Sequence, residues 1–121
     1  MWGWLKSLAG SVATAKPQEP RSPRWPKVRD AWLKAHPECA CCGTREHLTV
    51  HHIWPFSWPG GHELELDFRN FITLCETPGH NCHHAIAHLL DWRSCNPTVQ
   101  ADAAWFRRRI AERPYPPKDA T

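Results

Sequence analysis

The fold of this chain is decided by the stretch Leu48-Thr49-Val50-His51-His52-Ile53. Its β-branched residues and alternating apolar positions predict a strand. Side chains alternate across a strand, so the imidazoles of His51 and His52 are expected to point to opposite sides. One imidazole can then bind a metal ion while the other faces a different part of the same site.

The segments around this strand predict a small α+β fold. Residues 68–75 predict a second strand, or a turn that leads into one, and Cys82 to Trp92 predict a short helix. A helix that begins at Pro26 and ends before Pro37 is expected to precede the strands. Its apolar residues at helical spacing are Trp25, Val28, Trp32 and Ala35, and the two tryptophans are expected to pack in the core.

The pair Asn96-Pro97 predicts the start of a last helix, because asparagine caps helices and proline suits the first helical position. One face of this helix is expected to carry Val99, Ala103, Phe106 and Ile110. We divide the chain into an amphipathic segment and basic Pro-rich arm (1–23), a domain (24–113) and a Pro-rich tail (114–121).

Length and composition favour one small domain that needs covalent or metal cross-links for stability. The chain has 121 residues, with 6 Cys, 8 Trp, 9 His and 12 Pro. The longest stretch without Asp, Glu, Lys or Arg has 16 residues (47–62) and is broken by prolines, so no transmembrane helix is expected. A core this small is expected to be stapled by disulfides or metal.

Charge is distributed unevenly along the sequence. Residues 1–34 carry a balance of +5, residues 35–92 carry −5, and residues 93–121 carry +3. Basic flanks suit a polyanion such as nucleic acid, and an acidic, His-rich centre suits a cation. Flanks that are simply solvated remain the plain alternative.

The N-terminus offers only weak support for export. Trp2, Trp4, Leu5, Leu8 and Val12 predict a short amphipathic segment, but Lys6 interrupts the apolar run and no basic region precedes it. We therefore expect a cytoplasmic protein without a membrane partner, and reduced cysteines that hold metal. A secreted disulfide scaffold is the alternative.

Four cysteines have spacings that predict a structural zinc site. Cys39 and Cys42, separated by two residues, form one half of a tetrahedral site, and Cys75 and Cys82 can supply the other half. Cys41 can replace Cys39 or Cys42 in another register. Cys95 is expected to be a small buried residue.

A second histidine group, His83, His84 and His88, follows Cys82. On an ideal α-helix, residues five apart such as His83 and His88 diverge by roughly 140°. Either His83 precedes the helix and His88 joins it at a metal ion, or only one of them is a ligand. We expect His84 to be exposed.

The combined pattern resembles the HNH endonucleases, the ββα-metal nucleases. The matching residues are Cys39-x2-Cys42, the stretch 48–53 with Pro55, Asn70 to Cys75, and Cys82-His83. The resemblance covers about residues 24–92. It implies a ββα-metal core with a structural zinc ion from Cys39, Cys42, Cys75 and Cys82, flanked here by an N-terminal and a C-terminal helix.

The resemblance also implies the roles of individual residues. His52 would be the general base, Asn70 would fix the loop and orient His52, and His83 would bind the catalytic divalent ion. His51, where the family often has aspartate, would be another ligand, with His88 as a further one. The ion would be Mg²⁺, Mn²⁺, Ni²⁺ or Zn²⁺.

The implied reaction is metal-dependent hydrolysis of phosphodiester bonds in DNA, which is expected to be double-stranded. Basic residues would hold phosphates without reading bases. The candidates are Arg24, Lys27, Arg69, Arg107, Arg108 and Arg109, together with Arg21 and Arg29. Partners in phage DNA packaging or restriction are a further implication. The alternatives are a degraded nuclease that acts only as such a partner, and a non-catalytic, zinc-stabilised DNA-binding module.

Overall fold

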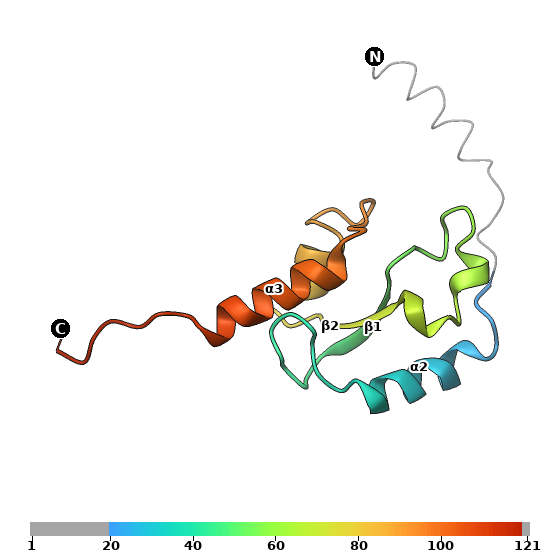
Figure 1. The fold of residues 1–121 in the computed structure, drawn as a ribbon. Coiled ribbons are helices and arrows are strands. Elements are labelled where there is room, and N and C mark those ends of the chain that lie inside the picture. Colours follow the sequence, from blue (N-terminus) through green and yellow to red (C-terminus); the bar gives the residue numbers. More distant parts are fainter. Residues whose placement is uncertain (1–19, 120–121) are drawn as a thin grey trace, which may run out of the picture.

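A two-stranded antiparallel sheet forms the centre of the molecule (Figure 1). The structure is a computed structural model, and it describes residues 20–119. Strand β1 (Leu48–His52) pairs with strand β2 (Phe71–Cys75), with Leu48 opposite Cys75 and His52 opposite Phe71. The small α+β fold predicted from the sequence is confirmed at this level. The predicted amphipathic segment at the N-terminus lies outside the described residues.

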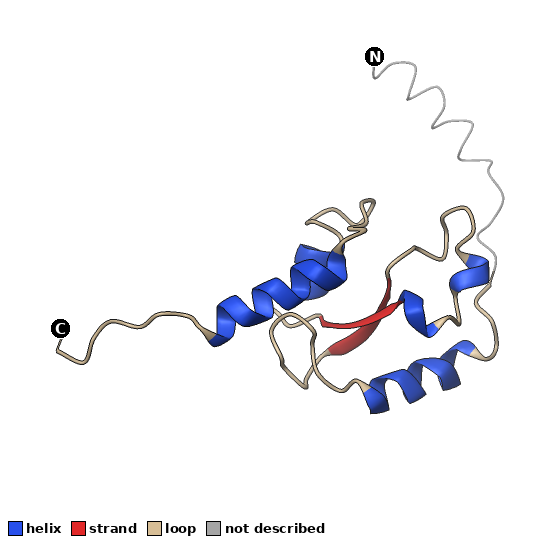
Figure 2. Cartoon of the chain, in the orientation of Figure 1, coloured by secondary structure: helices blue, strands red, loops and turns tan. Residues whose placement is uncertain are grey.

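Helix α2 (Trp25–Ala35) lies beside the sheet (Figure 2). Its two tryptophans make the contact. The rings of Trp25 and Trp32 meet Phe71 edge-on, at centroid distances of 5.5 and 5.4 Å. The Trp32 indole N–H also donates to the Thr73 hydroxyl at 3.0 Å. The helix has no fully buried residue, so the two tryptophans, which the sequence placed in the core, pack on the sheet but stay partly exposed.

The second strand is shorter than predicted. Residues 68–70 form a 3-10 turn, η2 (Phe68–Asn70), before the strand begins at Phe71. The turn forms because the Asp67 carboxylate accepts a hydrogen bond from the Arg69 N–H at 2.9 Å. A separate 3-10 turn, η1 (His62–Leu64), lies in the loop between the strands.

The helix predicted from Cys82 to Trp92 is wrong in length and type. Only a single π-helical turn, η3 (His83–Ala87), forms. Leu89 and Leu90 then adopt positive φ angles of 53° and 67°, which end the turn. Left-handed conformations at two successive leucines break the helical hydrogen-bond ladder, so the chain continues to Asn96 as a loop.

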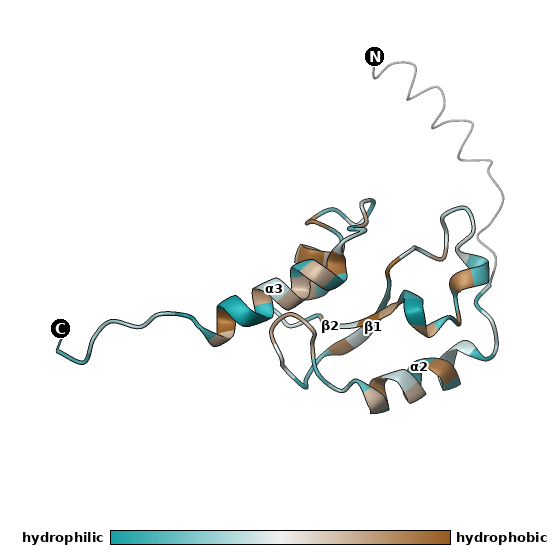
Figure 3. Ribbon diagram, in the orientation of Figure 1, coloured by the Kyte–Doolittle hydropathy of each residue, from teal (hydrophilic) through white to brown (hydrophobic). Residues whose placement is uncertain are grey.

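Helix α3 (Val99–Ala111) begins two residues later than Asn96-Pro97 predicts. The Asn96 side-chain oxygen accepts from the Thr98 N–H at 3.0 Å, which makes a turn ahead of the helix. Val99 and Ala103 are buried, but Phe106 is 42% exposed. Only the first half of α3 therefore packs on the core, and hydrophilic and hydrophobic segments alternate along its length (Figure 3).

No helix in residues 20–119 is long and apolar enough to cross a membrane.

Candidate metal centres and the adjoining cleft

Four thiols converge at one end of the sheet. One ligand atom each from Cys39, Cys42, Cys75 and Cys82 lies within 4.8 Å of the others. The sulfurs of Cys42 and Cys75 are 3.7 Å apart. A tetrahedral site with Zn–S bonds of ~2.3 Å places its sulfurs about 3.8 Å apart. The donor set and its spacing therefore fit a zinc ion, as the sequence predicted.

The turn that carries the first two thiols is shaped by its own hydrogen bonds. The Gly43 N–H donates to the Cys39 carbonyl at 2.9 Å, and Gly43 has a φ of +81°, which favours glycine. The Cys42 N–H points at the Cys39 sulfur at 3.4 Å. Cys41 is buried but lies outside the four-thiol group, so the alternative register is not the one formed.

The longer gap between Cys75 and Cys82 closes through a turn of its own. Thr77 and His80 form an isolated bridge, and Gly79 between them has a φ of +88°. The gap of six residues therefore does not separate the two halves of the cluster. None of the six cysteines is disulfide-bonded.

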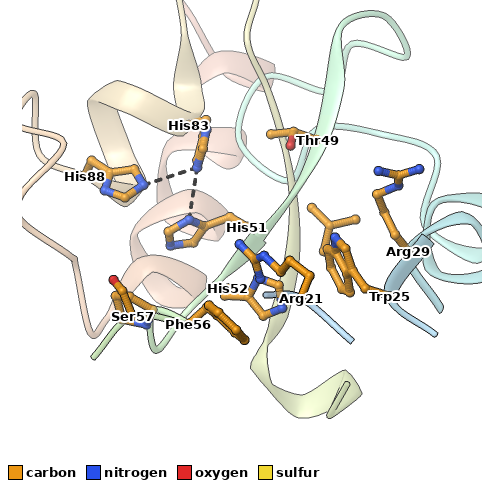
Figure 4. A pocket seen from close by; sticks show the side chains of 12 residues that line it. Arg21, Trp25, Arg29, Thr49, His51, His52, Phe56, Ser57, His83 and His88 are labelled. Atoms are coloured by element: carbon orange, nitrogen blue, oxygen red, sulfur yellow. Dashed lines mark hydrogen bonds between the residues drawn. The ribbon is translucent and has the colours of Figure 1, made fainter. Parts of the chain in front are cut away.

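Three imidazoles form a second cluster beside the first. His83 Nε2 lies 3.1 Å from His51 Nδ1 and 3.2 Å from His88 Nε2 (Figure 4). A tetrahedral ion with ~2.0 Å bonds places its nitrogens about 3.3 Å apart, so this set also fits a metal ion. Burial first, and the neighbouring imidazoles second, lower the pKa of His51 to about 3. The ring is therefore in the neutral form that binds metal.

In each of the three imidazoles, the ring nitrogen that points away from the cluster has a partner of its own. The three nitrogens that face one another are therefore available as metal ligands. His83 Nδ1 lies 3.4 Å from the Glu76 carboxylate, and His88 Nδ1 donates to the Ser94 carbonyl at 2.7 Å. His51 Nε2 is 3.9 Å from the sulfur of Cys95. Such partners fix ring orientation and raise ligand basicity. Cys95 is only partly buried, which corrects the prediction that it is a buried residue. Its thiol donates to the Ile53 carbonyl at 3.0 Å.

His52 points away from this cluster, as strand alternation predicts. Its Nε2–H donates to the Glu65 carbonyl at 2.8 Å, so Nδ1 keeps the lone pair. The ring packs against Trp25 and Phe71 at centroid distances of 4.5 and 5.2 Å. Burial lowers the pKa of His52, and the hydrogen bond to Glu65 opposes the shift. The ring is thus neutral at neutral pH and able to accept a proton.

Asn70 pins the loop that carries Glu65. Its side-chain oxygen accepts from the Trp54 N–H at 2.7 Å, and its amide group donates to the carbonyls of Trp54 and Leu64 at 3.1 and 3.3 Å. Gly61 allows the loop to fold tightly, since a Cβ there would lie 2.1 Å from the Pro55 carbonyl. Asn70 therefore positions His52 indirectly, through Leu64 and the adjoining Glu65.

His52 and the three clustered imidazoles line one cleft of about 360 Å³ (Figure 4). Arg21 and Arg29 line it too, so two cations from the basic N-terminal flank reach the site. The sequence included both arginines among many basic candidates, but it gave no reason to place them here.

The other predicted basic residues lie elsewhere. Arg69 is paired with Asp67 at 2.8 Å, and Arg107 donates to the Cys39 carbonyl at 3.1 Å behind the thiol cluster. The remaining four are exposed and outside the cleft: Arg24, Lys27, Arg108 and Arg109. His84 is partly buried against the Trp92 ring at 4.6 Å, which corrects the prediction that it is exposed.

Comparison with protein-family models, curated proteins and solved structures found no match. The resemblance to HNH endonucleases therefore stays a prediction that depends on the quoted residues alone.

Proposed function

We propose that this protein is a metal-dependent endonuclease that hydrolyses phosphodiester bonds of DNA, with an HNH-type ββα core. The observation that carries the proposal is the shared cleft, which joins the imidazole cluster of His51, His83 and His88 to the separate imidazole of His52. A hydrolytic site needs both an ion at the phosphate and a base for water.

The two clusters differ in the way that structural and catalytic metal sites differ. Four cysteines satisfy a tetrahedral ion completely, which is typical of structural zinc. Three histidines leave a position open, which is typical of catalytic sites. The open side of the imidazole cluster faces solvent through the cleft, because all three histidines line it.

A divalent ion held by the three imidazoles would supply positive charge at the scissile phosphate. The chain's own residues supply the proton chemistry. His52 accepts the proton of the attacking water at Nδ1, since the Glu65 carbonyl occupies Nε2. Asn70 keeps the Glu65 loop in place and is a positioning residue. The exposed basic candidates outside the cleft attract the DNA backbone, and these are Arg24, Lys27, Arg108 and Arg109.

The decisive experiment is incubation of the purified full chain with supercoiled plasmid across Mg²⁺, Mn²⁺, Ni²⁺ and Zn²⁺. We expect nicking with at least one ion, and none after chelation. His52→Ala should abolish nicking while metal content and folding persist, and His80→Ala, at an exposed histidine outside the cleft, should nick normally. Full activity in His52→Ala would remove the proposed base. Plasmid binding without nicking under every ion would favour the non-catalytic DNA-binding module.

A further inference from the structure

The segment just before α2 is fastened to the loop between the strands. The Ser22 N–H donates to both carboxylate oxygens of Glu65, at 3.2 and 3.1 Å. Glu65 is only 4% exposed, so its carboxylate is shielded from water, and its charge also attracts Arg21. Residues 20–23 are the described end of the basic Pro-rich arm and are called the arm from here on. They belong to the folded site, although the division made from the sequence placed them outside the domain.

The contact between Ser22 and Glu65 brings the neighbouring Arg21 to the cleft. The Arg21 guanidinium lies 4.4 Å from the ring centroid of Phe56 and 5.6 Å from that of Trp25. Within residues 20–119, these ring contacts and the charge of Glu65 hold the guanidinium, and no side chain or carbonyl accepts a hydrogen bond from it. The N–H donors of this guanidinium are therefore available to a ligand in the cleft that Arg21 lines.

We propose that the arm forms a phosphate subsite in which Arg21 binds a backbone phosphate of the DNA strand without help from metal. This subsite rests on the proposed function and names how that cleft holds its substrate. A guanidinium suits the task because its planar fork matches phosphate oxygens in pairs. Because Arg21 and His52 line the same cleft, we expect the bound phosphate to belong to the strand that is cut.

Glu65 is the positioning residue of this subsite. Its carboxylate holds the arm, and its carbonyl accepts the hydrogen bond of His52. One buried residue thus fixes the positions of both the phosphate-binding cation, Arg21, and the general base, His52. Removal of the carboxylate would free the arm and leave the backbone contact to His52 in place.

The test measures binding without turnover. The full chain, with no divalent ion added and with its zinc content verified, is titrated against a short fluorescein-labelled DNA duplex by anisotropy. We expect Arg21→Met to weaken binding roughly tenfold and to lower the salt slope by about one. Arg113→Met, which removes an exposed arginine at the C-terminal end of the domain, is the charge-matched control and should change affinity less than twofold.

Two further variants separate a phosphate contact from a change of fold. Arg21→Lys keeps the charge but not the fork, so we expect only partial recovery of affinity. Glu65→Gln should weaken binding, and the double variant with Arg21→Met should lose no more than Arg21→Met alone, because both act through one contact. Additive losses, or equal affinity for wild type and Arg21→Met, would overturn the subsite.

Inorganic phosphate distinguishes a simple anion site from a DNA-specific one. We expect phosphate to compete with the duplex for the wild-type chain and not for Arg21→Met. Equal competition in both would contradict the proposal. Wild-type DNA affinity in Arg21→Met combined with lost nicking in His52→Ala would reject this subsite and leave the proposed function standing. Loss of affinity in Arg21→Met, together with no nicking by the wild type, would support the subsite and reject the proposed nuclease function.

Discussion

His83 and His88 bring their Nε2 atoms to 3.2 Å although five positions separate them in the sequence. On an α-helix these side chains would diverge by roughly 140°. The π-helical turn removes the divergence, because the His88 N–H donates to the His83 carbonyl five residues back, at 3.2 Å. Single π turns occur frequently at functional sites. Of the two alternatives that the sequence left open, the structure agrees with the first in bringing His88 to His83, but His83 begins the π-helical turn and does not precede a helix.

The imidazole cluster is expected to bind its own ion. His88→Ala should reduce the bound metal from two ions per chain to one, because it removes one of three donors and leaves the thiols intact. Metal analysis after dialysis against a limiting concentration of Co²⁺ or Zn²⁺ measures this directly. His84→Ala, on the same turn but outside the cluster, should retain both ions. Two ions in His88→Ala would contradict the assignment.

The thiol cluster is expected to hold zinc through Cys42 and not Cys41. Cys42→Ser should lose the tightly bound zinc and most of the cooperative thermal transition, since metal binding supplies much of the folding free energy of so small a domain. Cys41→Ala should keep the zinc, because Cys41 lies outside the group. Zinc content and a thermal melt distinguish them, and zinc retained in Cys42→Ser alone would show that Cys41 is the ligand.

The strand pair and the grouping of the four cysteines could be predicted from sequence because both depend on local patterns. Alternating apolar residues define β1, and a gap of two residues brings Cys39 to Cys42. The π turn could not be predicted, since an α-helical and a π-helical turn share the same local residue preferences. The deciding contact, between the His88 ring and the Ser94 carbonyl, forms only in the folded chain.

The contact that brings Arg21 to the cleft, between Ser22 and Glu65, also could not be predicted from the sequence. Ser22 and Glu65 lie 43 positions apart, and no spacing rule relates them. Glu65 stands among other acidic residues of the centre, and only its burial distinguishes it. The signal available beforehand was weak: a basic, Pro-rich arm next to a predicted domain.

The loop after the π turn stores backbone strain that can be released. Leu90 is 69% exposed and has a φ of 67°, a conformation that costs roughly 1 kcal/mol in a residue with a Cβ. Leu90→Gly should increase the free energy of unfolding by about 1 kcal/mol. The midpoint of thermal unfolding should then rise by a few degrees. Leu90→Ala keeps the Cβ and should show no such gain. A lower midpoint in the glycine variant would mean that the leucine packs favourably.

Asn70 is expected to stabilise the loop between the strands. Asn70→Ala removes three hydrogen bonds at a buried position and leaves the Trp54 N–H and two carbonyls without their partner. We expect a loss of roughly 3 kcal/mol in the free energy of unfolding, measured by urea denaturation. Asn70→Asp retains the acceptor for Trp54 and should lose less. A loss below about 0.5 kcal/mol for Asn70→Ala would show that water replaces these contacts.

Cys82 and His83 are neighbours in the chain but belong to different clusters, and Cys75 is likewise followed by Glu76, whose carboxylate meets His83. Replacement of the four thiols with apolar side chains would therefore disturb the imidazole cluster as well, because no residue separates Cys82 from His83 in the chain. The same adjacency predicts that a residue inserted between Cys82 and His83 would separate the two clusters, whereas one inserted in the loop between Glu76 and Cys82 would leave that bond intact.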